Sequence, residues 1–279
     1  MTAIQLEDHL AVVRTALRSG EQVTRRSLGQ HFLLGGRELR SVVVAAGDLE
    51  GRVVVEVGPG PGGLTAALLE TRVARVVAIE LDAAWAEFSE RHLDDPRLQV
   101  LRRDVREGSG AFLEQLLHEL CEGRPPAVVS NLPYQVASPV LVDLARSTSG
   151  VDPVVATVQS EVAERLRAAP GDRRRGLLTV LVGLHCRVRR VRRLAPGAFS
   201  PPPKVSSAVV ELRRHAPPLA PPEVLERATS LARSAFQERR KMLRGTLRGL
   251  VAPERLEHDG SRRPEELGES EWIELARSE

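Results

Sequence analysis

Short β-branched runs alternate with amphipathic helical patterns from Arg52 to Val158, and this alternation constrains the fold more than any other feature of the chain. Apolar strands of three to five residues that alternate with helices are typical of a parallel sheet that helices cover on both faces. The pattern therefore predicts an α/β domain. Its expected elements, in chain order, are strand 53–57, helix 64–71, strand 76–79, helix 83–92, strand 98–101, helix 111–122, strand 127–129, helix 141–146 and strand 154–158.

The pattern changes in the last third of the chain. Residues 187–194 and 205–212 alternate like strands without intervening helices, which indicates an antiparallel pair added to the sheet. Residues 215–223 contain four prolines and predict a stiff linker. Helical spacing returns at 224–236, 239–250 and 271–277. We therefore expect three parts: an α/β domain with an N-terminal arm (1–214), a Pro-rich linker (215–223) and a small helical domain (224–279).

Composition excludes several classes of protein. At 279 residues, 42% hydrophobic and 28% charged, the chain can bury a core and is not expected to be disordered. No apolar run approaches the roughly 20 residues that cross a bilayer, and acids near the N-terminus stand where a signal peptide has bases. Cys121 and Cys186 are too few for a disulfide framework or a cysteine-based zinc site. A cytoplasmic protein without a membrane partner is expected.

Charge is distributed unevenly along the chain. Residues 161–214 hold thirteen Lys or Arg against four Asp or Glu, and residues 231–250 hold six against one, although the whole chain has a net charge of only +3. The second half is therefore expected to face a polyanion.

A glycine-rich loop follows the first predicted strand. Residues 56–65 read Glu-Val-Gly-Pro-Gly-Pro-Gly-Gly-Leu-Thr, and glycines allow the backbone a tight turn and a close approach to a ligand. The loop has neither the Gly-Lys-Ser/Thr of a P-loop nor the strict G-x-G-x-x-G spacing of dinucleotide binders. Because such turns are common after strands, the loop alone is a weak signal.

Two carboxylates at strand ends sharpen the interpretation. Glu80 ends the second strand, eighteen residues after Gly62, where it can accept both hydroxyls of a ribose. Asp104 follows the third strand and can accept from an adenine amino group. A nucleoside is thus accommodated, but nothing nearby would neutralise phosphates. This combination favours S-adenosylmethionine over NAD or ATP.

The segment Asn131-Leu132-Pro133-Tyr134 ends the fourth strand. The Asn131 side-chain oxygen and the Leu132 carbonyl can each accept one hydrogen of an exocyclic amine and so turn its lone pair towards a methyl donor. Tyr134 can stack on the base. The segment therefore predicts methylation of an amine on a planar base.

The chain resembles the small-subunit (16S) rRNA adenine N6,N6-dimethyltransferase family, the kasugamycin-sensitivity type. Six ordered motifs carry the resemblance, namely 28–33 (LGQHFL), 56–65 (EVGPGPGGLT), 131–139 (NLPYQVASP), 159–166 (QSEVAERL), 199–210 (FSPPPKVSSAVV) and 235–244 (AFQERRKMLR).

The resemblance implies a Rossmann-like seven-stranded methyltransferase sheet, S-adenosylmethionine as methyl donor, no metal, and dimethylation of two adjacent adenosines near the 3′ end of small-subunit rRNA, with no protein partner implied. The expected substrate is the rRNA or the pre-30S particle. The family's cofactor contacts carry over to His31, Leu33, Gly58, Glu80, Asp104 and Asn131. Catalysis is expected from Asn131, Leu132 and Tyr134, with Phe199 as a second stacking surface opposite Tyr134. The basic second half predicts RNA binding by Lys204, Arg239, Arg240 and Lys241.

Three alternatives use the same residues differently. A macrolide-resistance (Erm) methyltransferase of large-subunit (23S) rRNA shares the fold and chemistry but typically has Asn-Ile-Pro where this chain has Leu132. A non-catalytic ribosome-assembly factor would be expected to have lost residues such as Glu56 or Asn131, which are present. A DNA adenine methyltransferase usually carries Asp-Pro-Pro-Tyr in place of the segment at 131–134.

Overall fold

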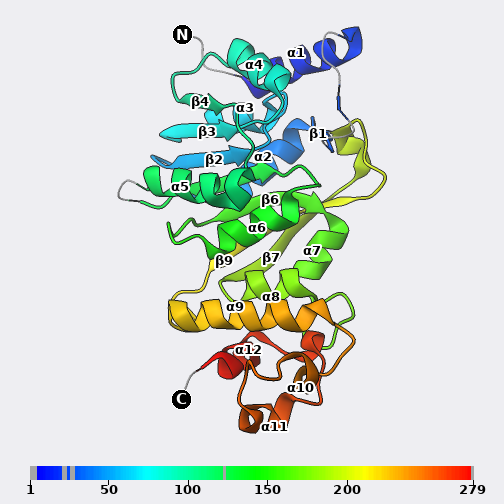
Figure 1. The fold of residues 1–279 in the computed structure, drawn as a ribbon. Coiled ribbons are helices and arrows are strands. Elements are labelled where there is room, and N and C mark those ends of the chain that lie inside the picture. The colour runs from blue at the N-terminus through cyan, green and yellow to red at the C-terminus, as the bar shows by residue number, and fades with distance from the viewer. Residues whose placement is uncertain (1–4, 21–23, 26–28, 122–123, 278–279) are drawn as a thin grey trace. The chain divides into compact units, whose positions relative to one another are not determined.

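The computed structural model describes residues 5–20, 24–25, 29–121 and 124–277, and Leu28 and Glu122 of the expectations above lie outside them. The chain forms two compact units (Figure 1). The first unit comprises the chain up to Ser160 together with Arg189–Leu212, and the second comprises Glu161–Val188 together with the chain from Arg213. A functional division at residues 215–223 stays a prediction.

A seven-stranded sheet organises the first unit, with strand order β4-β3-β2-β5-β6-β9-β7. The chain adds strands outwards from β2 to β4 and then returns to place β5 on the other side of β2, so the order reverses between these two strands. In open α/β sheets, ligands bind outside the carboxyl ends of the strands at such a reversal. The strands are β2 (Val53–Val57), β3 (Arg75–Ile79), β4 (Leu98–Leu101), β5 (Ala127–Asn131), β6 (Val154–Gln159), β7 (Cys186–Leu194) and β9 (Ser207–Arg214).

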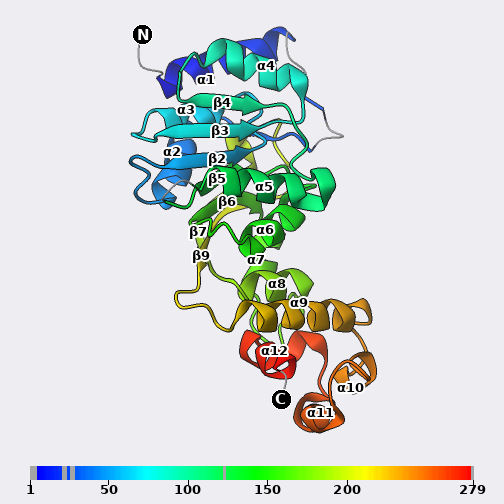
Figure 2. The same cartoon turned by 60° about the vertical axis from the view of Figure 1, so that its left-hand side comes forward.

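The five predicted strands of the alternating pattern are parallel, and β9 joins β6 antiparallel, which confirms the predicted α/β fold class and the two late strands. Four helices share a core with one face of the sheet, and two others pack on the opposite face (Figures 1 and 2). The first set is α1 (Leu6–Ser19), α2 (Gly36–Ala45), α3 (Gly63–Leu69) and α4 (Ala83–His92), and the second set is α5 (Ala111–Glu119) and α6 (Ala137–Arg146).

A small antiparallel ladder joins the N-terminal arm to a segment far along the chain. β1 (Phe32–Leu33) pairs with β8 (Phe199–Ser200), so that Leu33 lies opposite Phe199. The Phe199 side chain is 4% exposed and packs in the first unit's core. Neither this ladder nor helices α1 and α2 were expected, because the strand pattern begins only at Arg52.

The second unit is helical and packs around Trp272, which is fully buried. Pro222 begins α9 although it was expected in the linker; proline suits a first turn because its missing N–H has no partner there. Its helices are α7 (Ser160–Leu166, which begins one residue before the unit does), α8 (Leu177–Gly183), α9 (Pro222–Gln237), α10 (Leu243–Thr246), α11 (Leu256–Asp259) and α12 (Glu269–Ala276). 3₁₀ turns span Glu107–Gly110 and Pro196–Ala198 in the first unit, and Pro253–Arg255 and Pro264–Glu266 in the second.

The predicted helix at 239–250 is wrong. α9 ends at Gln237 because Glu238 leaves the helical region (φ −123°, ψ 54°), and the Lys241 N–H donates to the Glu238 carbonyl at 2.7 Å in a tight turn. Only Leu243–Thr246 is helical in this stretch, where glycines at 245 and 249 lower helix propensity.

The buried ring of Phe199 leads to a test of its structural role. Replacing Phe199 with Ala leaves a cavity in the core and should lower the free energy of unfolding by about 3–5 kcal/mol, measured by urea denaturation. Phe199→Leu, which retains most of the volume, should cost markedly less. Equal stabilities of Phe199→Ala and the wild type would contradict the packing described here.

Candidate functional site

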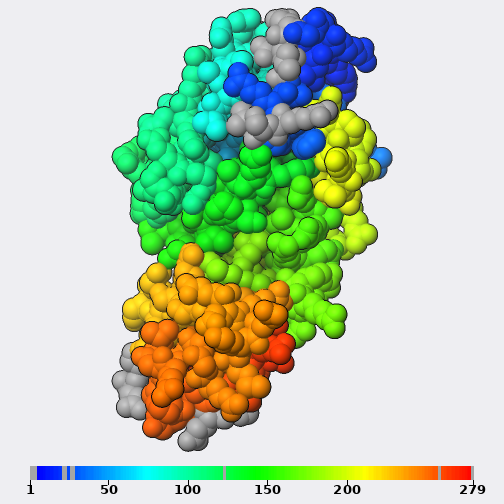
Figure 3. Space-filling view, turned by 45° about the vertical axis from the view of Figure 1, so that its right-hand side comes forward, coloured from blue at the N-terminus to red at the C-terminus, as the bar shows by residue number. Residues whose placement is uncertain are grey.

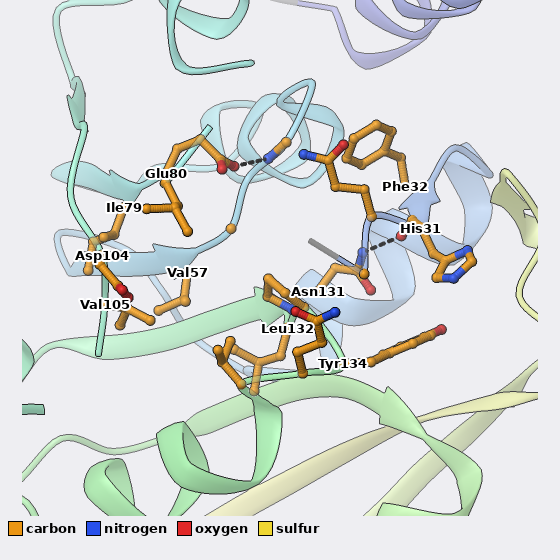
Figure 4. A pocket seen from close by; sticks show the side chains of 18 of the residues that line it. His31, Phe32, Val57, Ile79, Glu80, Asp104, Val105, Asn131, Leu132 and Tyr134 are labelled. Carbon is orange, nitrogen blue, oxygen red and sulfur yellow. Dashed lines mark hydrogen bonds between the residues drawn. The ribbon is translucent and has the colours of Figure 1, made fainter. Parts of the chain in front are cut away.

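A pocket opens at the carboxyl ends of β2, β3 and β5, where the strand order reverses (Figure 4). It collects residues from the N-terminal arm, the glycine loop, the ends of these three strands and the segment that follows β4. The lining residues are Gly29, Gln30, His31, Phe32, Val57, Gly58, Gly60, Ile79, Glu80, Leu81, Arg103, Asp104, Val105, Asn131, Leu132, Pro133, Tyr134, Gln135 and Val136.

Side chains are excluded from the glycine loop by its neighbours. Gly58 has φ +67°, and a Cβ atom there would lie 2.7 Å from Pro133 Cγ. Gly60 has φ +55°, and its Cβ would lie 2.5 Å from Phe32 Cε1. Both positions therefore require glycine on conformational and on steric grounds. The two glycines thus allow Pro133 and Phe32, which also line the pocket, to pack directly against the loop.

Glu80 closes one end of the pocket with its acceptors already oriented. One carboxylate oxygen accepts from the Gly60 N–H at 2.9 Å and the other from the Asp82 N–H at 2.8 Å (Figure 4 draws the bond to Gly60). A carboxylate has about four acceptor positions, so these backbone bonds leave capacity to accept from a ribose hydroxyl. Burial raises the pKa of Glu80, while the backbone N–H groups oppose that rise. This geometry fits the predicted contact to a donor's sugar.

Asp104 and its apolar neighbours suit a planar heterocycle. Asp104 is exposed at the pocket rim, and its Oδ1 accepts from the Arg106 N–H at 2.8 Å, which fixes the carboxylate. Val57, Ile79 and Val105 line the pocket beside it. A purine between these apolar groups would place an amino group within reach of the carboxylate. The apolar residues were missed by sequence reasoning, although each stands within one or two residues of a predicted site residue.

Asn131 presents an unused acceptor to the pocket. Its Nδ2 donates to the His31 carbonyl at 3.0 Å, which fixes the orientation of the amide (Figure 4). Its Oδ1 is buried and has no hydrogen-bond partner within the described part of the chain. A buried polar atom without a partner costs free energy, on the order of 1–3 kcal/mol. At the pocket, this acceptor can take a hydrogen bond from an N–H or O–H group of a ligand.

The Tyr134 ring is held at two points. Its hydroxyl forms a 2.7 Å hydrogen bond with Ser207 Oγ, and its ring stacks on His31 with centroids 5.3 Å apart and an interplanar angle of 28°. The His31 ring is held in turn by a 2.8 Å hydrogen bond between Nδ1 and the Pro201 carbonyl. Burial raises the pKa of Tyr134 above its ordinary value. The positioning role of Ser207 was not foreseen, although it stands within the motif at 199–210.

The structure does not bring every expected residue to the pocket. Leu33 is buried in β1 beside it, and it is the neighbouring Phe32 that lines the cavity. Phe199 does not face Tyr134 as a second stacking surface, because pairing of β8 with β1 holds it in the core.

The expected RNA-binding residues fall in different units. Lys204 is exposed between β8 and β9 in the first unit. Arg239, Arg240 and Lys241 belong to the second unit, where Arg239 donates to the Arg173 carbonyl at 2.7 Å and lies 3.5 Å from Glu265, and Lys241 pairs with Glu238. Arg240 is exposed. Their contact with RNA stays a prediction.

Comparison with known proteins identifies the family of this chain. Residues 21–267 match the family model described as ribosomal RNA adenine dimethylase. The chain belongs to this family. Family membership confirms the predicted resemblance and the predicted enzyme class, an rRNA adenine methyltransferase.

Curated relatives and solved structures agree. Two proteins named ribosomal RNA small subunit methyltransferase A are similar to this chain: that of Gluconobacter oxydans is 39% identical over 96% of this chain and 87% of the relative, and that of Xanthobacter autotrophicus is 41% identical over 87% and 83%. The crystal structure of a dimethyladenosine transferase from Plasmodium falciparum covers 86% of this chain and 94% of its own at 24% identity, with a TM-score of 0.69. That of the 23S rRNA methyltransferase ErmE covers 88% and 98% at 24% identity, with a TM-score of 0.63. These two structures show the shared fold.

The family and the fold support S-adenosylmethionine as methyl donor. Glu80, Asp104, the glycine loop and the unused acceptor of Asn131 fit such a molecule. Among the described side chains, no three His, Cys, Asp or Glu residues come together in a way that suits a metal ion, and a metal-free reaction stays a prediction. None of the helices in the described ranges combines the length and apolar character that a bilayer crossing needs.

The Glu80 carboxylate should contribute to donor affinity. Glu80→Ala leaves two hydroxyls of the donor unpaired, on the order of 1–3 kcal/mol, so the Kd for S-adenosylmethionine should rise about ten- to a hundredfold, measured by calorimetry. The control is Glu87→Ala, which removes an exposed carboxylate of α4 that pairs with Arg91. Normal donor affinity in a folded Glu80→Ala variant would exclude the sugar contact.

Glu56 should make stability depend on pH. Its carboxyl is 1% exposed, and burial raises its pKa from 4.5 to about 8, although the Thr65 hydroxyl donates to it at 2.7 Å and opposes the rise. Because the folded state then binds the proton more tightly than the unfolded state, this group lowers stability as pH rises from about 4.5 to about 8.

Glu56→Gln should remove that contribution while its amide oxygen still accepts from Thr65. Urea unfolding of both proteins at pH 5, 6.5 and 8 should show the variant gaining on the wild type as pH increases. Parallel stability curves would refute the raised pKa.

Proposed function

We propose that this protein transfers methyl groups from S-adenosylmethionine to N6 of two adjacent adenosines near the 3′ end of small-subunit (16S) rRNA during ribosome biogenesis. The unused acceptor of Asn131, at a pocket that Glu80 and Asp104 also line, carries the proposal. Family membership and relatives named small subunit methyltransferase A support it.

In this function the chain positions an amine. Asn131 Oδ1 and the Leu132 carbonyl each accept one N–H of the adenine amine, so that the nitrogen lone pair points away from both. S-adenosylmethionine, when bound, supplies a methyl group on a positively charged sulfur. As positive charge develops on the adenine nitrogen, these two oriented dipoles stabilise it, and holding the reactants in line lowers the barrier further.

Capture of the base depends on Tyr134. An adenine must leave its stack to enter the pocket, which costs a few kcal/mol, and stacking on an aromatic side chain offsets this cost. The Ser207 hydroxyl and the His31 ring hold Tyr134 in one orientation, so little freedom is lost when a base stacks on it.

The remaining expectations belong to the same proposal. The partner is small-subunit rRNA within a pre-30S particle, held in part by Lys204 and the basic turn at 239–241, and the location is the cytoplasm. These residues are exposed or half-buried, as contact with a polyanion requires.

Methyl transfer to isolated subunits tests the function. Small subunits from a strain without this activity are incubated with the protein and radiolabelled S-adenosylmethionine, with large subunits as the matched control. We expect label in small-subunit rRNA, found as N6,N6-dimethyladenosine at two adjacent positions by mass spectrometry. Label in large subunits would favour the Erm-type activity, and label in neither would leave only a non-catalytic role in assembly.

Asn131 and Tyr134 should act on different steps. Asn131→Ala removes the acceptor that matters as charge builds on nitrogen, so the single-turnover rate at saturating donor and subunit should fall about a hundredfold, by analogy with removal of one oriented polar group from an enzyme site. Tyr134→Ala loses stacking worth roughly 1–3 kcal/mol and should mainly raise the KM for subunits. Tyr134→Phe should retain much of the activity. A wild-type rate for Asn131→Ala would exclude the amine-orienting role.

Within the basic turn, Arg240 is the sharpest test of RNA contact, because Arg239 also supports the Arg173 carbonyl and Lys241 pairs with Glu238. Arg240→Glu should weaken binding to small subunits and lower its salt dependence, with donor affinity unchanged. Arg233→Glu, at an exposed position of α9 in the same unit, is a matched charge reversal. Equal effects of both variants would mean that net charge alone is responsible.

A further inference from the structure

A second hollow in the first unit is lined by arginines and has no assigned role. Arg14 and Arg18 of α1 stand with Arg192 and Arg193 at the end of β7, and among the described residues that line the hollow Glu38 is the one with an acidic side chain. We call the hollow that these four arginines line the arginine groove. Leu34 and Phe199 contribute apolar lining.

Two sequence-distant segments build this groove, and the β1–β8 ladder holds them together. Leu33 pairs with Phe199, and the Leu34 N–H donates to the Ala198 carbonyl at 3.0 Å. Arg14 Nη2 donates to the Leu34 carbonyl at 2.8 Å, which takes one of the five N–H donors of its guanidinium. Figure 3 shows the blue N-terminal residues and the yellow residues near position 200 meeting on one face of this unit. The positive charges are thus brought together by the fold itself.

The groove and the donor pocket are lined in part by neighbouring stretches of the N-terminal arm. His31 and Phe32 line the pocket, and Leu34 and Gly35, which follow after Leu33, line the groove. When a base of a nucleic acid strand enters the pocket beside Tyr134, the charged backbone on either side of that base must run over the surface next to the pocket. Along the arm, Leu33 alone stands between Phe32 of the pocket and Leu34 of the groove.

We propose that the arginine groove binds the sugar–phosphate backbone of the substrate RNA next to the base being methylated. This inference rests on the proposed function and adds a contact in the first unit to the basic residues already considered. Guanidinium groups match phosphate oxygens in a bidentate manner, and several of them along one surface bind a polyanion far better than a single phosphate. Arg18 and Arg193 are exposed and Arg14 and Arg192 are half-buried, so all four are within reach of solvent-borne phosphates.

The test removes three groove charges and leaves the structural one. Arg18, Arg192 and Arg193 are replaced with Gln, while Arg14 is retained for its bond to Leu34. The matched control replaces Arg72, Arg91 and Arg102 with Gln; these are exposed arginines of the same unit that pair with glutamates outside the groove. Both triple variants lose the same charge.

The measurements are the Kd for undermethylated small subunits between 50 and 300 mM KCl, the Kd for S-adenosylmethionine, and thermal unfolding. Each phosphate contact contributes about 0.7–0.9 to the slope of log Kd against log salt concentration, so the slope should fall by about 2 in the groove variant. Affinity near 0.1 M salt should fall at least about tenfold. Donor affinity and the methylation rate at saturating subunits should stay at wild-type values, and the control should keep the wild-type slope.

An unchanged slope in a folded groove variant would overturn the proposal while leaving the proposed function intact, since methylation would proceed normally. An equal decrease in both triple variants would also overturn it, because the effect would then follow from net charge. Failure of the wild-type protein to methylate any subunit would instead remove the proposed function, a result that the groove variant does not influence.

Discussion

The hydrogen bond from Asn131 Nδ2 to the His31 carbonyl ties together the parts on which the site depends. It joins the end of β5, at the reversal of strand order, to the N-terminal arm, which the adjoining β1–β8 ladder holds from its other side. Because the amide has only one other polar atom, committing Nδ2 to the arm leaves Oδ1 directed elsewhere as an acceptor. The same arm carries His31, which stacks on Tyr134, and Phe32, which covers Gly60. One bond thus sets the acceptor, the stacking ring and one side of the glycine loop.

The glycine loop itself is rigid because buried side chains satisfy its backbone. Ser89 donates to the Gly60 carbonyl at 2.9 Å, Glu80 accepts from the Gly60 N–H, and His9 is 2.7 Å from the Pro61 carbonyl. Burial lowers the pKa of His9, so the neutral ring is favoured, and it donates through Nε2 to this carbonyl. A loop of left-handed glycines loses much conformational freedom on folding. These bonds to α1, α4 and β3 compensate, and they pre-organise the loop for its ligand.

How far the sequence predicts this structure depends on the range of the interactions involved. The strands from Val53 to Gln159 and the placement of Glu80, Asp104 and Asn131 at their ends follow from local periodicity, which the sequence displays directly. The β1–β8 ladder does not, because its two-residue strands are too short for a pattern and are separated by more than 160 residues. Phe199 was misplaced for that reason: its motif suggests a stacking surface, and only the pairing with Leu33 shows that the ring is buried. The predicted helix at 239–250 is wrong because the sequence shows only the helical propensity of the basic run. It does not show that α9 ends before Glu238 and that a tight turn follows.

Two successive methyl transfers require one pocket to bind the adenine first with an unmodified amine and then with a monomethylated amine. The unmodified amine offers two N–H groups to Asn131 Oδ1 and the Leu132 carbonyl, whereas the monomethylated amine offers one, so hydrogen bonding to the amine is weaker in the second step by the contribution of one bond, about 1 kcal/mol. Affinity for the base must then come from contacts that methylation leaves unchanged. Stacking on Tyr134 is such a contact, and the ring is fixed from outside the amine's reach, by Ser207 at its hydroxyl and by His31 at its face. Backbone contacts to the flanking RNA are equally indifferent to the state of the amine. We infer that the same pocket accepts the adenine twice because Asn131 orients the amine while Tyr134 independently binds the base.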